Sequence, residues 1–347
     1  MKALVYRGSG QKEYVEKAMP VITKPTDAIV KIIHTTICGT DLHILKGDVP
    51  AVTDGTVLGH EGVGIVTEIG DGVTNFKIGD KVIISCVSAC GKCDYCKRGI
   101  SAHCTDGGWI LGHLIDGTQA EYVRIPHADN SLYLIDGDDK DDKALVMLSD
   151  ILPTGLEIGV LKGNVQPGST VAIVGAGPIG LSALLTAQFY SPSEIIMIDL
   201  DDARLEAAQK FGATHVVNPS NGDAVNRIME LTDGKGVDVA IEAVGIDSTF
   251  DICQRIVTAG GNIAVAGVYG KSVNFEIEKL WIKNITLTTG LVSAVTTPML
   301  IKTVDAKKLL PELLITHHFT FDQMLEAYDV FEKAADNKAL KVIISAV

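Results

Sequence analysis

The sequence lacks the features that mark nucleic-acid-binding, membrane-spanning and secreted proteins. It has 30 Lys and Arg against 43 Asp and Glu, a formal net charge of −13, which argues against nucleic acid or an anionic membrane as a partner. No apolar run is expected to approach the ~20 residues that span a bilayer. The N-terminal stretch 1–7 turns polar too soon to form a signal-peptide core. We therefore expect a soluble, cytoplasmic protein, and the chain shows no internal repeat.

The cysteines do not suit a disulfide framework. There are 7 of them, an odd number, and four crowd into one short stretch, which in a reducing cytosol indicates metal. Their spacing, C-x2-C-x2-C-x7-C, predicts a closed tetrahedral zinc site with a structural role. An iron–sulfur cluster is the alternative, but no Pro follows the fourth Cys and nothing else suggests electron transfer. The predicted ligands are Cys90, Cys93, Cys96 and Cys104.

A second group of metal-ligand residue types lies between His34 and Glu61. It contains the thiol of Cys38, the imidazole of His60 and the carboxylate of Glu61. Sulfur with imidazole is a donor set that zinc selects, and three protein ligands leave a fourth position open for chemistry. Taken alone, the stretch also fits a buried structural Cys beside two surface histidines. A third ligand elsewhere in the chain would decide between the two readings.

Length and composition predict two domains of an α/β protein. A chain of 347 residues exceeds one ordinary core, and 46% apolar residues with 35 glycines suit a globular enzyme. Short alternating apolar segments separated by turn residues predict a mainly antiparallel, barrel-like β domain. An acidic patch at 136–143 is interpreted as a solvated loop, and a helical period begins at Ala144. The expected strands are 3–6, 28–33, 64–69, 81–85 and 120–125.

The pattern changes at Thr170 to buried strands that alternate with helices. Continuous apolar runs such as 171–174 indicate strands covered on both faces, and six of them predict a Rossmann-type doubly wound parallel sheet. After Gly290 the chain is expected to form helices over 299–310 and 321–335 and a last strand over 339–345. The expected domains are a catalytic domain, 1–152 with 291–347 returning to it, and an NAD-binding domain, 153–290.

A glycine motif follows the first of these strands. Gly175 permits the tight turn, Gly177 lets the backbone approach a pyrophosphate, and Gly180 lets helix and strand pack closely. The helix that begins at Pro178 offers the free N–H groups of its first turn, including that of Ile179, to the phosphates, whereas Pro178 itself has no N–H to donate. Asp199 ends the second strand, where a carboxylate binds the ribose hydroxyls and repels a 2′-phosphate. We therefore expect NAD, although nearby Arg204 could accommodate the phosphate of NADP.

Together and in order, these motifs resemble the zinc-dependent medium-chain alcohol dehydrogenases over the whole length of the chain. The resemblance implies that Cys38 and His60 bind a catalytic zinc. Many members supply a Cys as the third ligand, but this chain has Asp150, as in the bacterial secondary-alcohol and formaldehyde-type branch. A carboxylate is an acceptable zinc ligand. Glu61 resembles a family Glu that can approach the metal transiently, and Asp41 is expected to orient His60.

The resemblance also implies the remaining roles. Thr40 corresponds to the hydroxyl that accepts the substrate proton, and His43 to the histidine that passes it to solvent. Trp109 and Leu291 resemble substrate-pocket residues, and Lys341 stands where members often place a basic residue near the pyrophosphate. The expected cofactors are two zinc ions per chain, one catalytic and one structural, and NAD. The expected partners are a small alcohol, aldehyde or ketone and further copies of the chain in a homotetramer.

Four other functions remain to be weighed against an alcohol dehydrogenase. A polyol or diol dehydrogenase of the same superfamily usually carries Glu as the third ligand, and a formaldehyde dehydrogenase or dismutase is typically longer. A cofactor-binding protein without catalysis would be expected to have lost a ligand or a relay residue, and none is lost here. Zinc-free quinone reductases are disfavoured by both cysteine sets. The favoured function is hydride transfer between small primary or secondary alcohols and NAD.

Overall fold

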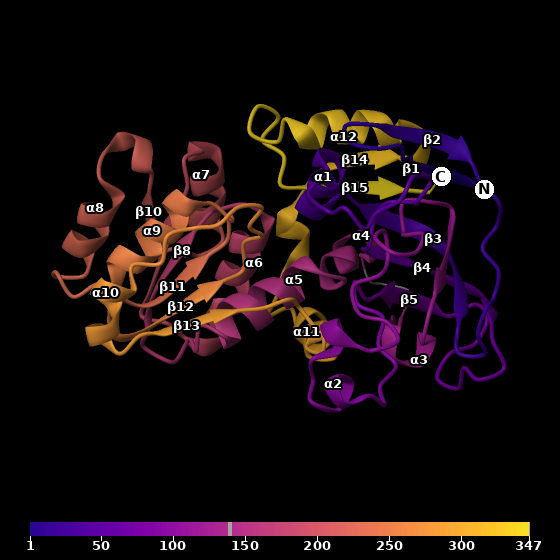
Figure 1. Cartoon of the computed structure of the whole chain (residues 1–347), viewed down its shortest axis with the longest axis horizontal. Coiled ribbons are helices and arrows are strands. Elements are labelled where there is room, and N and C mark those ends of the chain that lie inside the picture. Colours follow the sequence, from indigo (N-terminus) through magenta and orange to yellow (C-terminus); the bar gives the residue numbers. More distant parts are fainter. Residues whose placement is uncertain (138–140, 347) are drawn as a thin grey trace. The chain divides into compact units, whose positions relative to one another are not determined.

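The computed structural model describes residues 1–137 and 141–346 and divides into two compact units (Figure 1). Unit 1 comprises Met1–Asp150 and Ser293–Val347, and unit 2 comprises Ile151–Val292. The division falls at 150 and 293, against expected domain limits of 152 and 291. The chain thus leaves unit 1 directly after Asp150 and returns to it near the end of the parallel sheet.

Unit 1 is built on a mainly antiparallel sheet, as the alternating segments predict. Its strand order is β14-β15-β3-β4-β5-β7, with β6 also paired to β3, and β1 pairs separately with β2. Among the named strands of the described part of unit 1, β14 and β15 pair in parallel and the other pairs are antiparallel. No strand was predicted at β2, β7 or β14, because short, partly exposed strands leave little hydrophobic periodicity in the sequence. The strands are β1 Lys2–Tyr6, β2 Lys12–Glu16, β3 Ala28–Thr36, β4 Gly62–Ile69, β5 Lys81–Ile84, β6 Tyr122–Ile125, β7 Leu132–Leu134, β14 Ile315–Thr320 and β15 Lys341–Ser345.

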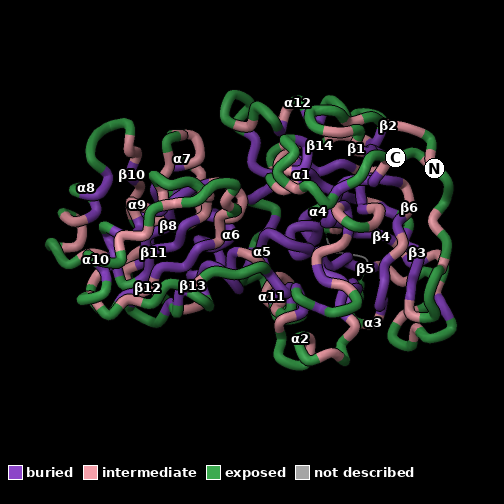
Figure 2. Tube along the Cα trace, in the orientation of Figure 1, coloured by how far each residue is buried: buried purple, intermediate pink, exposed green. Residues whose placement is uncertain are grey.

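The core of unit 1 joins residues from both ends of the chain. Leu4, Val30 and Ile84 pack with Met324 and Ile344 in one buried cluster, and Figure 2 shows β3, β4 and β5 as mainly buried. Burial of such side chains contributes about 1.5–3 kcal/mol each. The C-terminal segment is therefore an integral part of unit 1.

The helices of unit 1 are short. The expected helix 321–335 is a 3₁₀ turn, Phe321–Gln323, followed by α12, and the expected helix 299–310 begins two residues earlier and ends at Asp305. The helices are α1 Gly39–Lys46, α2 Asp94–Lys97, α3 Ala128–Ser131, α4 Asp142–Leu145, α11 Thr297–Asp305 and α12 Met324–Glu332. Shorter 3₁₀ turns are η1 Ser101–His103, η2 Val146–Leu148, η7 Pro311–Leu314 and η8 Phe321–Gln323.

Unit 2 contains the parallel sheet that the buried apolar runs predict. Its strand order is β10-β9-β8-β11-β12-β13, which is the 3-2-1-4-5-6 order of a dinucleotide-binding fold. Every pairing in it is parallel. The strands are β8 Thr170–Val174, β9 Glu194–Ile198, β10 His215–Val217, β11 Val237–Glu242, β12 Val257–Val265 and β13 Thr286–Thr289. The expected α/β fold is confirmed.

Helices cover both faces of this sheet, because alternate strand residues point to opposite sides. Ala172 and Val174 of β8 pack in a cluster with residues of α8 and α9. On the other face, Gly159 lies close to Ile241 of β11 and to Ala183 of α6. The helices of unit 2 are α5 Ile151–Thr154, the π-helical run η3 Gly155–Leu161, α6 Pro178–Ala187, α7 Asp202–Lys210, α8 Ala224–Leu231, α9 Asp247–Ile256 and α10 Ile277–Leu280, with 3₁₀ turns η4 Gln188–Tyr190, η5 Pro219–Asn221 and η6 Trp281–Lys283.

One apolar helical run lies in the core of the protein. Among the described residues, the helical run Asp142–Leu161 has 20 residues and is apolar enough to cross a membrane by length and composition. However, 83% of its apolar window is buried inside the protein, which is the behaviour of a core helix. Residues 138–140 of the acidic patch lie outside the described part of the chain. Within the patch, Asp142 forms an ion pair of 2.8 Å with Lys81.

Candidate active site and metal centres

Cys38 is the N-cap of α1, so its thiol lies at the positive end of a helix dipole. Its backbone N–H donates to Asp41 Oδ2 at 2.9 Å, which closes a capping box at the helix start. The thiolate is the form of a cysteine that binds metal. Thr40 Oγ1, in the first turn of α1, lies 3.7 Å from Cys38 Sγ. The sequence C-G-T-D therefore builds a thiol and a hydroxyl on one helix start.

His60 and Glu61 lie in the chain that leads into β4, at a point where the backbone is tightly enclosed. The preceding Gly59 has a φ of +90°, and a side chain there would meet Thr118 and Gln119. The carbonyl of Glu61 accepts hydrogen bonds of 2.8 Å from the hydroxyls of Thr35 and Thr118. These contacts fix the direction of both functional side chains.

Asp150 completes the cluster, although it is far from the other members in sequence. Its Oδ2 lies 3.2 Å from His60 Nε2 and 3.9 Å from Cys38 Sγ. The ligand atoms of Cys38, His60, Glu61 and Asp150 all lie within 4.8 Å of one another, and all four residues are buried. The fold thus brings together the three ligands that the resemblance implies, and Glu61 beside them.

The chemistry of this cluster suits a cation. Burial alone would lower the pKa of His60, but Asp150 and Cys38 raise it well above its usual value. The surroundings therefore favour positive charge at this point. In addition, Glu61 Oε1 and Asp41 Oδ1 are buried without a hydrogen-bond partner among the described residues. Sulfur, imidazole and carboxylate donors in a buried site fit a zinc ion.

Lys341 lies against this cluster. Its ammonium donates to Glu61 Oε2 at 2.6 Å and to the carbonyl of Ile37 at 3.2 Å, and both charged side chains are 1% exposed. Burial opposes the charged form most strongly, but Glu61, Cys38 and Asp150 together raise the pKa of Lys341 above its usual value. The ammonium is therefore engaged with Glu61, whereas the resemblance implied a place near the cofactor pyrophosphate.

Thr40 and His43 lie one turn apart on α1, which places them on the same face of the helix. Thr40 is beside Cys38, whereas the side chain of His43 is 32% exposed. His43 Nδ1 lies 2.8 Å from Asp48 Oδ2, and Asp48 just beyond the helix was not identified from the sequence. The spacing H-x4-D was the available signal. A carboxylate on Nδ1 fixes the ring orientation and leaves Nε2 free.

The four-cysteine lobe folds around its own sulfur atoms. The ligand atoms of Cys90, Cys93, Cys96 and Cys104 lie within 4.8 Å of one another, and none is in a disulfide. Backbone N–H groups point at the sulfurs: Cys90 N lies 3.2 Å from Cys104 Sγ, and Cys93 N lies 3.4 Å from Cys90 Sγ. Such donors stabilise thiolates, as a closed tetrahedral site requires.

Two thiols of the lobe have pKa values shifted in opposite directions. The backbone N–H of Cys96 lowers the pKa of Cys93 to about 6. By contrast, burial raises the pKa of Cys96 to about 12. A divalent ion among the sulfurs would remove this conflict, because it deprotonates coordinating thiols. The lobe therefore fits a structural zinc ion.

The glycine loop of unit 2 has the geometry that a dinucleotide needs. Gly175 has a φ of +107° and ends β8 in a tight turn. A side chain at Gly180 would overlap the carbonyl of Gly175, so the helix packs directly on the loop. At Gly177 the nearest atom to an added Cβ is Arg204 Nη1, at 3.9 Å. Open space over Gly177, at the start of α6 where Pro178 and Ile179 lie, suits a pyrophosphate.

Asp199 follows β9 directly, beside the glycine loop. Its carboxylate accepts hydrogen bonds from Ala176 N at 2.6 Å and from Asp201 N at 2.9 Å. Arg204 Nη1 lies 4.0 Å from Asp199 Oδ2. Asp201 is the N-cap of α7, so the helix-capping function belongs to Asp201 and leaves Asp199 at the cofactor loop.

The two expected substrate-pocket residues lie in different units. Trp109, in unit 1, is half-buried and stacks on His113 with ring centroids 4.3 Å apart. Leu291, in unit 2, is 43% exposed just after β13. Their chemistry, an aromatic face and an aliphatic side chain, suits the wall of an apolar pocket.

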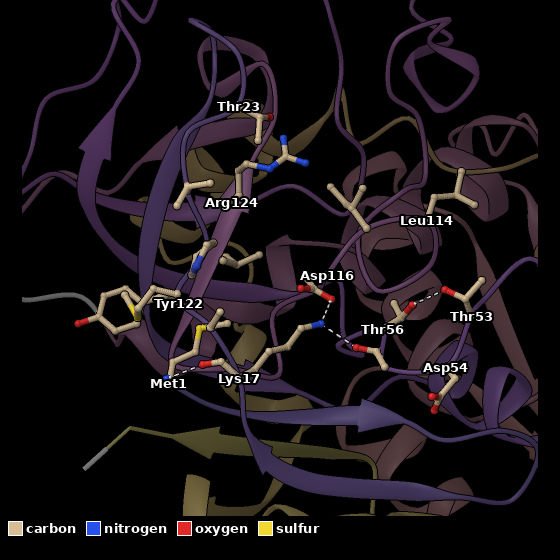
Figure 3. Close-up of a pocket in the computed structure, with 17 residues that line it drawn as sticks. Met1, Lys17, Thr23, Thr53, Asp54, Thr56, Leu114, Asp116, Tyr122 and Arg124 are labelled. Atoms are coloured by element: carbon tan, nitrogen blue, oxygen red, sulfur yellow. Dashed lines mark hydrogen bonds and ion pairs between the residues drawn. The ribbon is translucent and has the colours of Figure 1, made fainter.

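A pocket of about 520 Å³ opens elsewhere in unit 1 and includes none of the predicted site residues (Figure 3). Lys17 Nζ extends into it and is held by Asp116 Oδ1 and by the carbonyl of Gly55, each at 2.7 Å. The positive charge of Lys17 is therefore neutralised by the carboxylate of Asp116. We place the chemistry at the buried metal cluster, because titratable ligands converge there.

The comparisons with known proteins agree with the two-unit organisation. Residues 24–135 match the family described as "Alcohol dehydrogenase GroES-like domain", and residues 178–306 match "Zinc-binding dehydrogenase". A curated alcohol dehydrogenase of Cupriavidus necator is 36% identical over 369 residues, covering 99% of this chain and 98% of the relative.

Solved structures of alcohol dehydrogenases are also similar to this chain over its whole length. A zinc-dependent alcohol dehydrogenase 2 from Streptococcus pneumonia, in its apo form, is 61% identical with a TM-score of 0.96 and covers 100% of this chain and 98% of its own. The alcohol dehydrogenase TADH of Thermus sp. ATN1 is 31% identical with a TM-score of 0.92 over 100% of both chains.

Proposed function

Because the chain belongs to the zinc-dependent medium-chain alcohol dehydrogenase family, we propose that it transfers hydride between small primary or secondary alcohols and NAD. The protein is an oxidoreductase of this family. The observation that carries the proposal is the buried convergence of Cys38, His60 and Asp150. A protein that only binds the cofactor would not need this donor set in a water-excluded position.

Two zinc ions per chain have separate tasks in this proposal. Cys38, His60 and Asp150 would hold the catalytic ion, with Glu61 as a transient ligand, and the four-cysteine lobe would hold the structural ion. When bound, the catalytic zinc supplies a Lewis acid that lowers the pKa of an alcohol, and NAD supplies the hydride acceptor. The protein's own residues then supply the position and the route of the proton.

The proton leaves along α1 in this proposal. Thr40 Oγ1, beside Cys38, accepts the proton of the alcohol and gives up its own hydroxyl proton, and His43, one turn further along α1 and 32% exposed, is the group that releases a proton to solvent. Asp48 holds the Nδ1 side of His43, so Nε2 is the nitrogen that exchanges the proton. Such groups matter because the metal cluster itself is buried and a proton needs defined partners to leave it.

The cofactor is proposed to be NAD, held by the loop Gly175–Gly180 and by Asp199. An ionised carboxylate at the ribose repels the additional phosphate of NADP. Arg204 could favour that phosphate, but it already lies within 4.0 Å of Asp199 and 3.8 Å of Asp201. We expect NAD to bind at least about tenfold more tightly than NADP, a difference of about 1.4 kcal/mol. Titration of the protein with both cofactors measures this, and a preference for NADP would refute the assignment.

The reaction is tested by NADH formation with ethanol, 2-propanol and 2-butanol, before and after removal of the metals. We expect turnover with these small alcohols, loss of turnover with the metals, and its return when zinc is added back. Sorbitol serves as the comparison substrate for a polyol dehydrogenase. Turnover that persists after complete loss of zinc would overturn the mechanism, and a strong preference for sorbitol would change the substrate class.

We also propose that the chain assembles with copies of itself in the cytoplasm, as a homotetramer. In the described part of unit 2, β13 pairs only with β12 and leaves its other edge open. Leu287 on this strand is 37% exposed, and nearby Trp281 and Ile282 are each 68% exposed. An open apolar edge favours pairing with another strand, and two identical edges can pair about a two-fold axis. Light scattering of the wild type and of Leu287→Lys would show whether this edge holds the subunits together.

A further inference from the structure

Two buried polar side chains, Gln119 and Tyr328, have no part in the proposed metal ligation or proton relay, yet both connect to them. Both are 0% exposed, and they reach the site from opposite parts of the chain. Gln119 lies just before β6, and Tyr328 lies in α12. A buried amide and a buried hydroxyl are retained in a core only when their hydrogen bonds are made.

The contacts form one continuous chain. Tyr328 Oη donates to Gln119 Oε1 at 2.8 Å. Gln119 Nε2 donates to Asp41 Oδ2 at 3.1 Å and to the carbonyl of Thr36 at 3.1 Å. Asp41 Oδ2 also accepts the backbone N–H of Cys38 at 2.9 Å. The path therefore runs from α12 to the residue that begins α1.

The direction of every bond in this chain is determined by chemistry. The Thr36 carbonyl can only accept, as can an ionised Asp41 carboxylate, so the NH₂ end of Gln119 must face them. Its carbonyl end then faces Tyr328, which must donate. Burial raises the pKa of Tyr328 well above its usual value, so the hydroxyl keeps its proton. If the Gln119 amide were flipped, its carbonyl oxygen would face two other acceptors, the Thr36 carbonyl and the Asp41 carboxylate.

The other oxygen of Asp41 faces the metal cluster. Asp41 Oδ1 lies 3.9 Å from His60 Nδ1 and has no hydrogen-bond partner among the described residues. The second nitrogen of the ring, Nε2, faces Asp150. Because Oδ2 is held by Gln119 and by Cys38, the carboxylate cannot rotate away, and Oδ1 remains directed at the imidazole. Partners of this kind set the tautomer and orientation of a ligating histidine.

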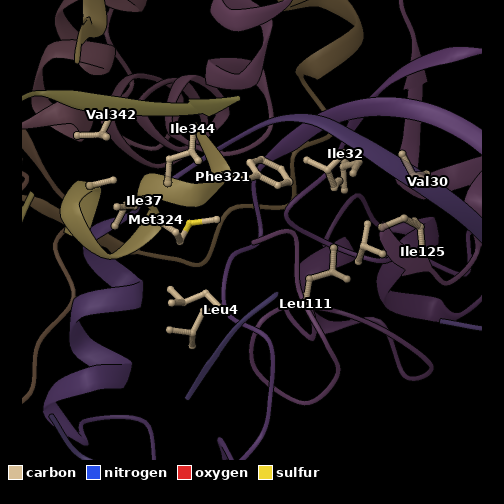
Figure 4. Packing of buried hydrophobic residues seen from close by; sticks show 14 of the residues in the cluster. Leu4, Val30, Ile32, Ile37, Leu111, Ile125, Phe321, Met324, Val342 and Ile344 are labelled. Atoms are coloured by element: carbon tan, nitrogen blue, oxygen red, sulfur yellow. The ribbon is translucent and has the colours of Figure 1, made fainter. Parts of the chain in front are cut away.

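Tyr328 is itself held rigidly. Its ring belongs to the core cluster with Ile37, Met324 and Ile344. Figure 4 shows the side chains of these three residues grouped together. Lys12 Nζ lies 5.1 Å from the ring centroid and pairs with Glu332 at 2.8 Å. The hydroxyl is therefore delivered to Gln119 by a packed helix and not by a mobile side chain.

We propose that Gln119 and Tyr328 are positioning residues that hold Asp41 toward His60 and thereby set the metal affinity of the Cys38–His60–Asp150 site. The proposal rests on the proposed metal site and extends it to α12, far along the chain. Replacement of groups that orient a ligating histidine lowers metal affinity by about 10–100-fold. We expect about tenfold for Tyr328→Phe and for Gln119→Leu, because both act through Asp41.

The test is the metal affinity of the full chain, measured by competition with a chromophoric chelator for zinc and by the visible spectrum of the cobalt-loaded protein. Tyr14→Phe is the matched control, since Tyr14 Oη is buried without a partner among the described residues. We expect Tyr328→Phe to weaken the Cys38 site about tenfold and to alter the cobalt spectrum, with Tyr14→Phe unchanged. The four-cysteine site should keep its affinity in both variants.

The double variant shows whether Gln119 and Tyr328 act on the metal site through one series of hydrogen bonds or independently of each other. If the residues act in series, Gln119→Leu with Tyr328→Phe should weaken binding about as much as Gln119→Leu alone, and not about a hundredfold. Additive losses, or a Tyr328→Phe affinity within about twofold of the wild type, would overturn the proposal. If Tyr328→Phe does not fold, Gln119→Leu with the cobalt spectrum still decides. Cys38→Ser must remove this metal from the wild-type background; if it does not, the proposed active site itself fails.

Discussion

The two metal clusters of unit 1 are assembled from opposite kinds of chain contact. The four-cysteine lobe is formed by residues 90–104 alone, whereas Cys38 and Asp150 are 112 positions apart. Three of the four lobe cysteines are partly exposed, and all four members of the other cluster are buried. The first needs only a short loop to close on an ion, but the second needs the completed core.

Because of this difference, we expect the four-cysteine lobe to stabilise the fold and the buried cluster to carry the reaction. A lobe with four identical donors has no position left for substrate, so its ion can only hold the chain together. The buried cluster has mixed donors, a neighbouring ion pair between Glu61 and Lys341, and a hydrogen-bond chain that runs to α12. Substitutions in the two clusters should therefore be detected by different measurements.

The largest expected effect is on folding, from Cys96→Ser. Loss of a structural metal belongs to the substitutions that destabilise by more than about 4 kcal/mol. We expect one zinc per chain to disappear and the thermal transition of unit 1 to fall, with NAD affinity retained in the fraction that is folded. Differential scanning calorimetry with metal analysis measures both.

Cys253→Ala is the control for this change, because Cys253 is a buried thiol in unit 2 outside either cluster. It should keep both metals. A Cys96→Ser protein with unchanged stability and full zinc content would show that the lobe is not a structural metal site.

Cys38→Ser is expected to have the opposite effect to Cys96→Ser, with a large loss of turnover and a small change in stability. Turnover should fall by about three orders of magnitude, since the Lewis acid supplies several kcal/mol. Stability should change by less than about 2 kcal/mol, because the lobe remains intact. Steady-state kinetics, NAD titration and metal analysis distinguish the two clusters, and retained turnover would contradict the assignment of Cys38.

Asp48→Asn should have the smallest effect. A charge-assisted hydrogen bond to His43 contributes about 1.4 kcal/mol, so kcat should fall about tenfold with little change in KM. The solvent deuterium isotope effect on kcat should rise as the proton step becomes slower. Asp48→Glu should restore part of the rate.

Asp54→Asn is the matched surface control, because Asp54 is an exposed carboxylate that only approaches Arg7 at 3.4 Å. An equal loss of kcat in both variants would indicate a general charge effect. Unchanged kinetics in Asp48→Asn would remove Asp48 from the proton route.

Prediction from sequence succeeded where neighbours in the chain are also neighbours in space. The cysteine spacing and the strand–glycine–helix element are short enough for their geometry to follow from local backbone rules, whereas the helix α1 was not predicted. The parallel sheet was identifiable because strands buried on both faces are continuously apolar. Strands β2, β7 and β14 were missed because they are short and partly exposed.

Gln119 and Tyr328 carried no recognisable signal, because a buried hydrogen bond across 209 positions leaves no pattern in sequence. Lys341 shows the same limit. Its position was assigned by resemblance, and only the fold shows its ammonium on Glu61, 280 positions away.

The sequence by itself determined the donor types, the closed cysteine lobe, the glycine loop and the two-domain order, since each depends on residue chemistry at short spacing. Only the tertiary structure decided that Cys38, His60 and Asp150 meet, that Lys341 pairs with Glu61, and that α12 reaches Asp41. The contacts of Lys341 and of α12 exist because the C-terminal segment packs into the same core as β3 and β4. Long-range packing brings such groups together, and the free energy that holds them there is distributed over the whole core.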